Sequence, residues 1–188
     1  MKSEEALMEL YPSLYQYLLE NKEELSNRHK AETGTRYEWF ALQRWGANYY
    51  EEFDEPKLIY IHTAKNHEFY FDTEKHYVNN SCYIIATESK YLYWFLNSSL
   101  FSYYKKIKFV AYGNGSTNGR CKLDGNKMAT VPIKVGVAEE PFESFFEKVM
   151  KTDNDEDRKK LEKEIDQLIY QLYGLTDEEI AIVEGKHE

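Results

Sequence analysis

The side chains best suited to chemistry in this chain are aromatic, amide and basic residues that alternate between positions 36 and 65. They are Arg36, Tyr37, Trp39, Gln43, Arg44, Trp45, Asn48, Tyr49, Tyr50, Lys57, Tyr60 and Lys65. Arginine can donate two hydrogen bonds to guanine, and glutamine or asparagine can pair in the same way with adenine. The neighbours Gln43 and Arg44 are therefore candidates for reading DNA bases. The alternative is that most of the aromatics form a core and that most of the charges are simply solvated.

A second basic group surrounds a glycine-rich segment, residues 113–119. The basic residues near it that could hold phosphates are Lys105, Lys106, Lys108, Arg120, Lys122 and Lys127. The glycines match neither the dinucleotide-binding fingerprint nor the P-loop, so an ordinary loop is the favoured interpretation. The lack of bulk in this segment, which contains Asn114, would still suit close contact with a nucleic-acid backbone.

The chain shows no recognisable catalytic or metal-binding pattern. His62 and His67 lack the i, i+4 spacing of a helical metal pair, and Cys82 and Cys121 are isolated. Residues 55–57 (EPK) echo the end of a nuclease metal site, but no matching acidic pair precedes them and the proline would disturb the strand, so surface charge is the favoured interpretation. No serine lies in a Gly-x-Ser-x-Gly elbow. We therefore expect no cofactor, no metal and no catalytic centre in this chain by itself.

The distribution of charge permits a nucleic-acid partner. The formal net charge is −9, yet residues 27–134 hold 15 basic and 11 acidic side chains, so the excess negative charge lies in the two ends. No apolar run approaches the roughly 20 residues of a membrane helix, and the first residues lack the pattern of a signal peptide. Two isolated cysteines suit a reducing compartment. We expect a cytoplasmic protein without membrane contact.

These side chains must be positioned by a β-rich middle between helical ends. Leu14, Tyr17, Leu18 and Leu25 recur at helical spacing, and Pro12 suits the first turn of a helix. The aromatic block 37–45 could be helical or irregular. Residues 58–62, 68–71 and 81–86 are typical of strands, residues 89–101 are typical of a helix, and 103–110 and 121–131 could be further strands.

The C-terminal part is predicted to be helical again. Phe142, Phe145, Phe146 and Val149 line one helix face, and Ile165, Leu168, Ile169 and Leu172 form a stripe on the next helix. Gly174 suits a helix C-cap, and Thr176 with Glu179 has the spacing of a capping box. The predicted fold is α+β, with a small antiparallel or mixed sheet. We expect an N-terminal helical segment (1–30), a β-rich core (31–135) and acidic C-terminal helices packed on that core (136–188), in one structural domain.

Several short stretches carry a family resemblance through their order and spacing. They are residues 37–44 (YEWFALQR), 55–60 (EPKLIY), 91–98 (YLYWFLNS), 131–133 (VPI) and 165–176 (IDQLIYQLYGLT). Together they resemble the TaqI-like C-terminal specificity domain. This is the target-recognition part of N6-adenine DNA methyltransferases and of fused type IIG restriction-modification enzymes. The likeness spans roughly residues 10–185.

The resemblance implies sequence-specific recognition of double-stranded DNA, with methylation or cleavage carried out by a catalytic domain in the same or a separate chain. Neither the catalytic Asn/Asp-Pro-Pro-aromatic motif nor a glycine-rich S-adenosylmethionine motif occurs here. We therefore expect an excised specificity domain or a free-standing partner of a catalytic chain. The expected DNA-contacting residues are Arg36, Gln43, Arg44, Asn48, Lys57, Lys65, Lys106, Lys108, Asn114, Arg120 and Lys122. Phosphate contacts would set the register, and a few of these side chains would read base edges.

Two other classes of protein remain open at this stage. The main alternative is a protein-interaction module, in which the acidic C-terminal helix docks on a partner and the aromatic block forms a core. Such a module would show no salt-dependent affinity for DNA. A small-molecule enzyme whose site assembles from distant residues is the second alternative. The sequence leaves the DNA target and the oligomeric state open.

Overall fold

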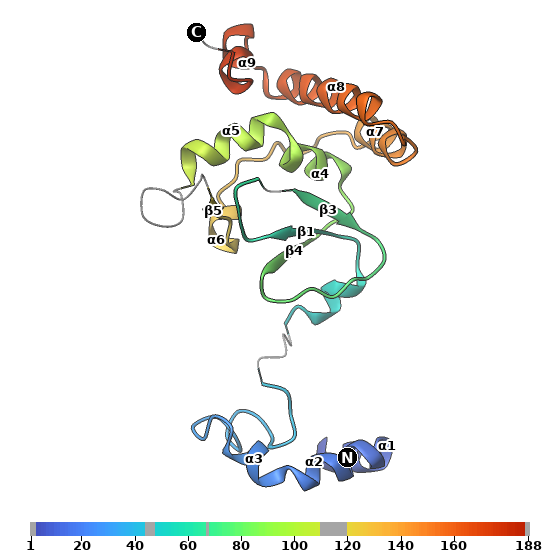
Figure 1. Cartoon of the computed structure of the whole chain (residues 1–188), viewed down its shortest axis with the longest axis vertical. Coiled ribbons are helices and arrows are strands. Elements are labelled where there is room, and N and C mark those ends of the chain that lie inside the picture. Colours follow the sequence, from blue (N-terminus) through green and yellow to red (C-terminus); the bar gives the residue numbers. More distant parts are fainter. Residues whose placement is uncertain (1–2, 44–47, 67, 110–119, 187–188) are drawn as a thin grey trace. The chain divides into compact units, whose positions relative to one another are not determined.

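The computed structural model describes residues 3–43, 48–66, 68–109 and 120–186. Contacts between Cα atoms divide the chain into two compact units, Met1–Tyr50 and Glu51–Glu188. Helices accompany two small antiparallel sheets, so the α+β prediction is confirmed (Figure 1). The three-part division at residues 30 and 135 stays a prediction. No helix in the described ranges combines the length and the apolar character needed to cross a membrane.

The Met1–Tyr50 unit begins with three short helices, where the sequence predicted a single helical segment. They are α1 (Ser3–Leu10), α2 (Pro12–Glu20) and α3 (Lys22–Asn27). Pro12 lies in the first turn of α2, where its missing N–H costs no helical hydrogen bond. None of the side chains in these three helices is buried. The helices therefore contribute little apolar burial to the stability of this unit.

Trp39 is the anchor of the Met1–Tyr50 unit. Its buried indole donates a hydrogen bond from Nε1 to the Glu4 carboxylate at 3.0 Å, and the Lys22 ammonium lies 4.7 Å from the centre of its ring. The Arg28 guanidinium donates to the carbonyl oxygens of Trp39 and Ala41 at 3.0 and 2.9 Å. The described part of the aromatic block thus folds as irregular turns tied to the three helices.

The Glu51–Glu188 unit contains the three strands that the sequence predicted. A 3-10 helix, η1 (Tyr50–Asp54), leads into β1 (Lys57–Ile61), which lies between β3 (Phe69–Asp72) and β4 (Cys82–Ala86) and is antiparallel to both. A second, smaller sheet pairs β2 (Thr63–Ala64) with β5 (Cys121–Lys122). This pairing brings residues that are far apart in the sequence to one end of the unit.

Helices cover the sheet in two layers. The first layer is α4 (Lys90–Asn97) and α5 (Ser99–Lys108), and the second is α7 (Glu140–Met150), α8 (Asp155–Tyr173) and α9 (Asp177–Val183) (Figure 1). A short helix, α6 (Gly125–Met128), follows β5. The expected strand over 103–110 is wrong for its described residues, because 103–108 continue α5. The expected strand over 121–131 shortens to β5, since the Asp124 carboxylate accepts from the Lys127 N–H and caps α6.

An aromatic core fills the space between the sheet and these helices. Its buried members are Leu58, Tyr60, Phe69, Phe71, Tyr91, Trp94, Phe95, Leu96, Phe101, Phe109, Cys121, Leu123, Phe142, Val149, Ile165 and Ile169. Phe69 of β3 meets Phe101 of α5 edge to face, with ring centroids 5.8 Å apart. Trp94 donates its indole N–H to the carbonyl oxygen of Phe142 on α7. Buried aromatic rings and satisfied polar groups therefore join all the layers of this unit.

The C-terminal caps agree with the sequence-based predictions. Gly174 ends α8 in the left-handed conformation, with a φ of 71° that favours glycine. Thr176 and Glu179 form both hydrogen bonds of a capping box at the start of α9. Along α8, Ile165 and Ile169 are buried, whereas Leu168 and Leu172 are partly buried and pack against the core.

Three consecutive residues at the α4–α5 junction lock the scaffold. Asn97 uses its side-chain amide to accept from the N–H and donate to the carbonyl oxygen of Phe69, both at 3.0 Å, as a neighbouring strand would at the edge strand β3. The Ser98 hydroxyl caps the first turn of α5. Ser99 donates its N–H and hydroxyl to the Asp166 carboxylate of α8, at 2.9 and 2.7 Å. These side chains fix the sheet and α5 relative to α8.

Candidate nucleic-acid interface

A pocket of about 420 Å³ lies among the C-terminal turns of α5, strand β5 and the segment that follows β2. Its lining residues are Lys65, Asn66, Ser102, Lys105, Lys106, Phe109 and Cys121. Three of them are lysines and none of these lining residues carries a carboxylate. The chemistry of the lining therefore suits an anionic ligand.

Strand pairing brings the lining residues of this pocket together. In the β2–β5 sheet, Ala64 lies opposite Cys121 and Thr63 lies opposite Lys122, so Lys65 and Asn66 emerge beside β5. The N–H of Leu123 donates to the carbonyl oxygen of His62 at 2.7 Å and extends this pairing. Strands β2 and β5 are more than fifty residues apart in the sequence, so no local pattern could have predicted that they lie side by side.

The pocket brings three lysine side chains close together where one of them is shielded from water. Lys105 is only 6% exposed, whereas Lys65 and Lys106 are exposed. Burial lowers the pKa of the Lys105 ammonium, and the charge of Lys106 lowers it further, while Cys121 acts in the opposite direction. Burial raises the pKa of the Cys121 thiol, against the effect of Lys105 and Lys127. A bound anion would offset the electrostatic cost of this arrangement.

Further basic side chains flank the pocket along the chain. Lys108 is exposed in the last turn of α5, and exposed Arg120 and half-buried Lys122 are the neighbours of Cys121. The Lys127 ammonium is turned inward and donates to the carbonyl oxygen of Lys122 at 2.9 Å. We call one set of six residues the basic end: Lys65, Lys105, Lys106, Lys108, Arg120 and Lys122. Five of these were DNA-contacting candidates from the sequence, and Lys105 was part of the basic group around the glycine-rich segment.

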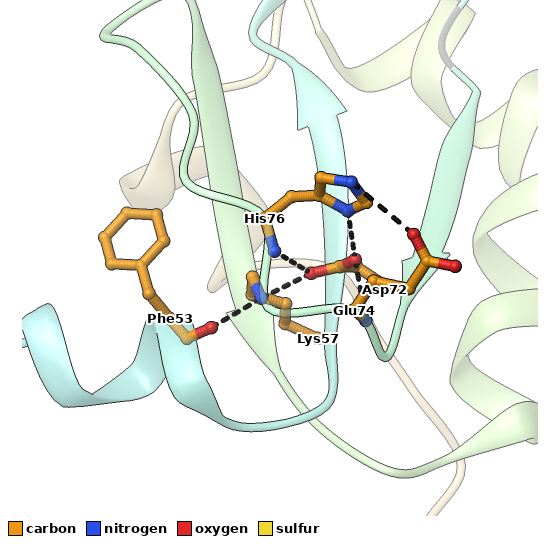
Figure 2. A network of polar contacts seen from close by, with 5 residues as sticks. All are labelled: Phe53, Lys57, Asp72, Glu74 and His76. Atoms are coloured by element: carbon orange, nitrogen blue, oxygen red, sulfur yellow. Dashed lines mark hydrogen bonds and ion pairs between the residues drawn. The ribbon is translucent and has the colours of Figure 1, made fainter.

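Lys57 lies elsewhere and has a different role. Its side chain is 0% exposed; its ammonium forms an ion pair with the buried Asp72 carboxylate and donates to the carbonyl oxygen of Phe53 at 2.7 Å (Figure 2). The interpretation of residues 55–57 as surface charge is therefore wrong for Lys57. A DNA contact does not fit this burial either, because the ammonium has no surface to offer to a phosphate.

Asp72 organises the chain that follows β3. Its carboxylate accepts hydrogen bonds from the N–H groups of Glu74 and His76, at 3.2 and 3.0 Å, and from the His76 ring at 2.7 Å (Figure 2). Burial by itself raises the pKa of Asp72. The hydrogen bonds from Lys57, His76 and the two backbone N–H groups outweigh it and lower the pKa to about 2. The only sequence signal was that the runs KLIYI and FYFD each carry one charge at the end of an apolar strand.

The predicted DNA-contacting residues in the Met1–Tyr50 unit are polar, and no described contact joins them to one another. Arg36 is 71% exposed, forms a 3.8 Å ion pair with Glu32, and lies over the ring of Tyr37. The half-buried Gln43 amide donates to the Thr33 hydroxyl at 3.4 Å, and Asn48 is exposed. Arg44 and Asn114 lie outside the described residues.

A second pocket, of about 540 Å³, has the opposite electrostatic character. It lies among β3, α4 and α8, and its titratable lining residues are Glu68, Tyr70, Tyr93, Arg158, Glu162 and Asp166. Burial raises the pKa of Asp166, although the hydrogen bonds from Ser99 act in the other direction. Three carboxyl groups against one guanidinium make this pocket a poor place for a phosphate backbone. Among the described residues, no group of three or more His, Cys, Asp or Glu side chains could hold a metal ion.

Comparison with known proteins places these features in a family context. A family model described as the TaqI-like C-terminal specificity domain matches residues 10–133. The matched range includes Trp39, the three-stranded sheet and the basic end. The C-terminal stretch 165–176, which also contributed to the resemblance, lies beyond it. No curated protein matches the chain.

Proposed function

Because this chain belongs to the TaqI-like C-terminal specificity domain family, we propose that it recognises a specific sequence in double-stranded DNA. It would do so on behalf of an N6-adenine DNA methyltransferase or a restriction-modification enzyme, such as one of type IIG. The catalytic domain would lie in the same chain or in a separate one, and it would flip the target adenine out of the duplex. This chain would contribute specificity without a cofactor or a catalytic centre of its own, in the cytoplasm.

The observation that supports DNA contact most directly is the basic end. Lys65, Lys105, Lys106, Lys108, Arg120 and Lys122 belong to a small region of one unit, around a pocket whose described lining residues include no carboxylate. Phosphate contacts supply most of the affinity of proteins for duplex DNA and fix the register of the protein on it. The strongly acidic C-terminal segment and the carboxylate-lined pocket would then face away from the backbone.

Base reading would come from polar side chains in or near the aromatic block rather than from the α4–α5 junction. The side chains of Asn97, Ser98 and Ser99 already form hydrogen bonds, with β3, the first turn of α5 and Asp166 respectively. We therefore assign base reading to the exposed or half-exposed polar residues Arg36, Gln43 and Asn48, together with Arg44, because guanidinium and amide groups can pair with guanine and adenine edges. These residues lie in or next to the aromatic block.

The experiment is a titration of the chain with short duplexes, in which fluorescence anisotropy measures binding at several salt concentrations. Without its catalytic partner the chain should bind weakly, near the nonspecific range of about 10⁻⁴–10⁻⁶ M. Lys122→Ala should weaken binding to all sequences and flatten the dependence of log affinity on log salt. Lys163→Ala, on the exposed side of α8, is the matched control.

A selection from random duplexes, in the presence of the catalytic partner, tests the specificity. Gln43→Ala and Arg44→Ala should each cost about 1–3 kcal/mol on the selected sequence and little on others, if each reads a base. Absence of DNA binding at low salt, together with no gain in specificity for the catalytic partner, would overturn the proposal. The protein-interaction module would then become the better assignment.

A further inference from the structure

We propose that the pocket at the basic end binds one phosphate group, held between the ammonium groups of Lys65, Lys105 and Lys106. On the proposed function, which this second step requires, the bound group is a phosphodiester of the DNA backbone. A free phosphate ion presents the same chemistry, so the test below separates the two sources.

The first support for the proposal is the placement of the Lys105 charge. Its side chain is almost completely buried, yet it lines a pocket that opens to solvent and has no carboxylate among its described lining residues. Lys105 and Lys106 are neighbours whose positive charges repel each other, and a phosphate between the two amines would reduce that repulsion.

The second support is the combination of groups around that charge. Asn66 offers a side-chain amide and Ser102 a hydroxyl, which can donate to phosphate oxygens alongside the lysines. Phe109 and Cys121 are buried and form an apolar side of the pocket, where hydrogen bonds to an anion are strengthened. Ammonium groups with neutral donors are a common way to bind phosphate.

The third support is the rigidity of the elements that carry the lysines. Phe101 and Phe109 of the α5 region are buried in the aromatic core, and Asp166 binds the first residue of α5. The pairing of β2 with β5 fixes the start of the segment that contains Lys65 and Asn66. A pocket whose lysines are held in place binds an anion with a smaller loss of side-chain entropy than scattered surface lysines do.

The first arm of the test uses inorganic phosphate with the full chain. In proton–nitrogen correlation NMR spectra, phosphate should cause saturable shifts of the backbone amides of Asn66, Ser102 and Cys121, whereas chloride at equal ionic strength should not. Lys106→Met should abolish the saturable shifts, and Lys163→Met, on α8, should leave them unchanged. Melting temperatures establish that each variant is folded. If Lys105→Met fails to fold, the more exposed Lys65→Met and Lys106→Met carry the test.

The second arm measures the salt dependence of duplex binding by the Lys65→Met/Lys106→Met double variant. Loss of one phosphate contact should reduce the slope of log affinity against log salt by about 0.9. Phosphate shifts together with this change support a DNA phosphodiester in the pocket. Phosphate shifts with an unchanged slope, or with no DNA binding by the wild type, support the pocket and assign it to a free anion. An unchanged slope in the variant without phosphate shifts in the wild type overturns the pocket, while DNA binding itself stands.

Discussion

Phe101, Ile165 and Ile169 of the Glu51–Glu188 unit are almost completely buried, whereas Leu14 and Tyr17 of α2 in the Met1–Tyr50 unit are 49% and 63% exposed. Both regions carry helices whose apolar residues recur at helical spacing. Among the described residues of the Met1–Tyr50 unit, Trp39 is the single buried one. Helical spacing therefore shows which face of a helix is apolar, but it does not show whether that face is covered.

The two units also differ in what holds them together. The Glu51–Glu188 unit has an aromatic core, and each Å² of apolar surface buried contributes about 25 cal/mol to its stability. The Met1–Tyr50 unit relies on hydrogen bonds and a cation–π contact around Trp39. We expect the Glu51–Glu188 unit to provide most of the global stability. The Met1–Tyr50 unit should open locally at a much lower free energy. In the proposed function, the stable unit presents the basic end and the less stable unit supplies base-reading side chains.

Removal of the buried carboxylate in Asp72→Ala should have the largest effect of the substitutions considered. It leaves the Lys57 ammonium buried without its ion-pair partner, and such a loss typically costs about 3–5 kcal/mol. Urea unfolding monitored by tryptophan fluorescence would measure the change. The matched control is the double variant Lys57→Met/Asp72→Leu, which removes both charges and should recover much of the loss. Equal instability of the single and double variants would show that packing, not charge, holds this site.

A pair of apolar truncations tests the contrast between the units directly. Ile169→Ala, in the stripe of α8, should lower the free energy of unfolding by about 2–5 kcal/mol, because the side chain is fully buried. Leu14→Ala, on exposed α2, should change it by less than about 0.5 kcal/mol. Hydrogen exchange would show in addition whether protection in α8 falls while that in α2 is already low. Equal effects of the two truncations would mean that α2 is covered in solution.

The sequence predicted most of the strands and helix caps of the Glu51–Glu188 unit, but not every segment. The strands, the Gly174 cap and the Thr176–Glu179 capping box follow from local patterns, and the structure contains them. The expected strand at 103–110 failed because the Ser98 cap starts a new helix directly after α4. A local window contains the β-prone aromatics of this segment but not the cap that determines its conformation.

The sequence indicated which basic residues could form the candidate site, but it did not show which of them come together in the fold. Lys65, Lys106 and Arg120 were chosen because basic residues are dense in the middle of the chain. The β2–β5 pairing brings the segments of Lys65 and Arg120 together, and Lys106 of α5 lines the same pocket as Lys65. Lys57 looked identical to them in sequence, yet it lies opposite Asp72 in the β1–β3 register and is buried. Asn97 was part of a motif, and its hydrogen bonds to Phe69 explain why a side-chain amide is needed there. Long-range pairing decides which charges reach the surface.

The pH dependence of stability should also come mainly from the Glu51–Glu188 unit. The pKa of Asp72 is about 2, below its ordinary value of 3.8, so the carboxylate stabilises the fold above about pH 4. This contribution, roughly 2 kcal/mol, should be lost as the pH falls through 4 towards 2. Urea unfolding at several pH values measures it, and Asp72→Asn should flatten the dependence in this range. A wild-type curve as flat as that of the variant would mean that the ion pair contributes nothing net.

Only a small effect on stability is expected for Arg36→Ala in the Met1–Tyr50 unit. Arg36 is exposed and its contact with Glu32 is long, and exposed ion pairs of this kind contribute about 0.2–1 kcal/mol or less. The melting temperature of the Glu51–Glu188 unit should therefore stay unchanged, and a clear decrease would show that the two units stabilise each other.

The same variant should still matter for DNA if Arg36 contacts it. Loss of a phosphate contact would weaken all duplexes alike and reduce the salt slope by about 0.9. Loss of a base contact would cost about 1–3 kcal/mol on the selected sequence alone. Arg36→Lys separates the two, because lysine keeps the charge but lacks the planar pair of donors that guanine recognition needs. A phosphate contact should survive that substitution, and a base contact should not. Normal DNA binding by Arg36→Ala would remove Arg36 from the interface and leave base reading to Gln43, Arg44 and Asn48.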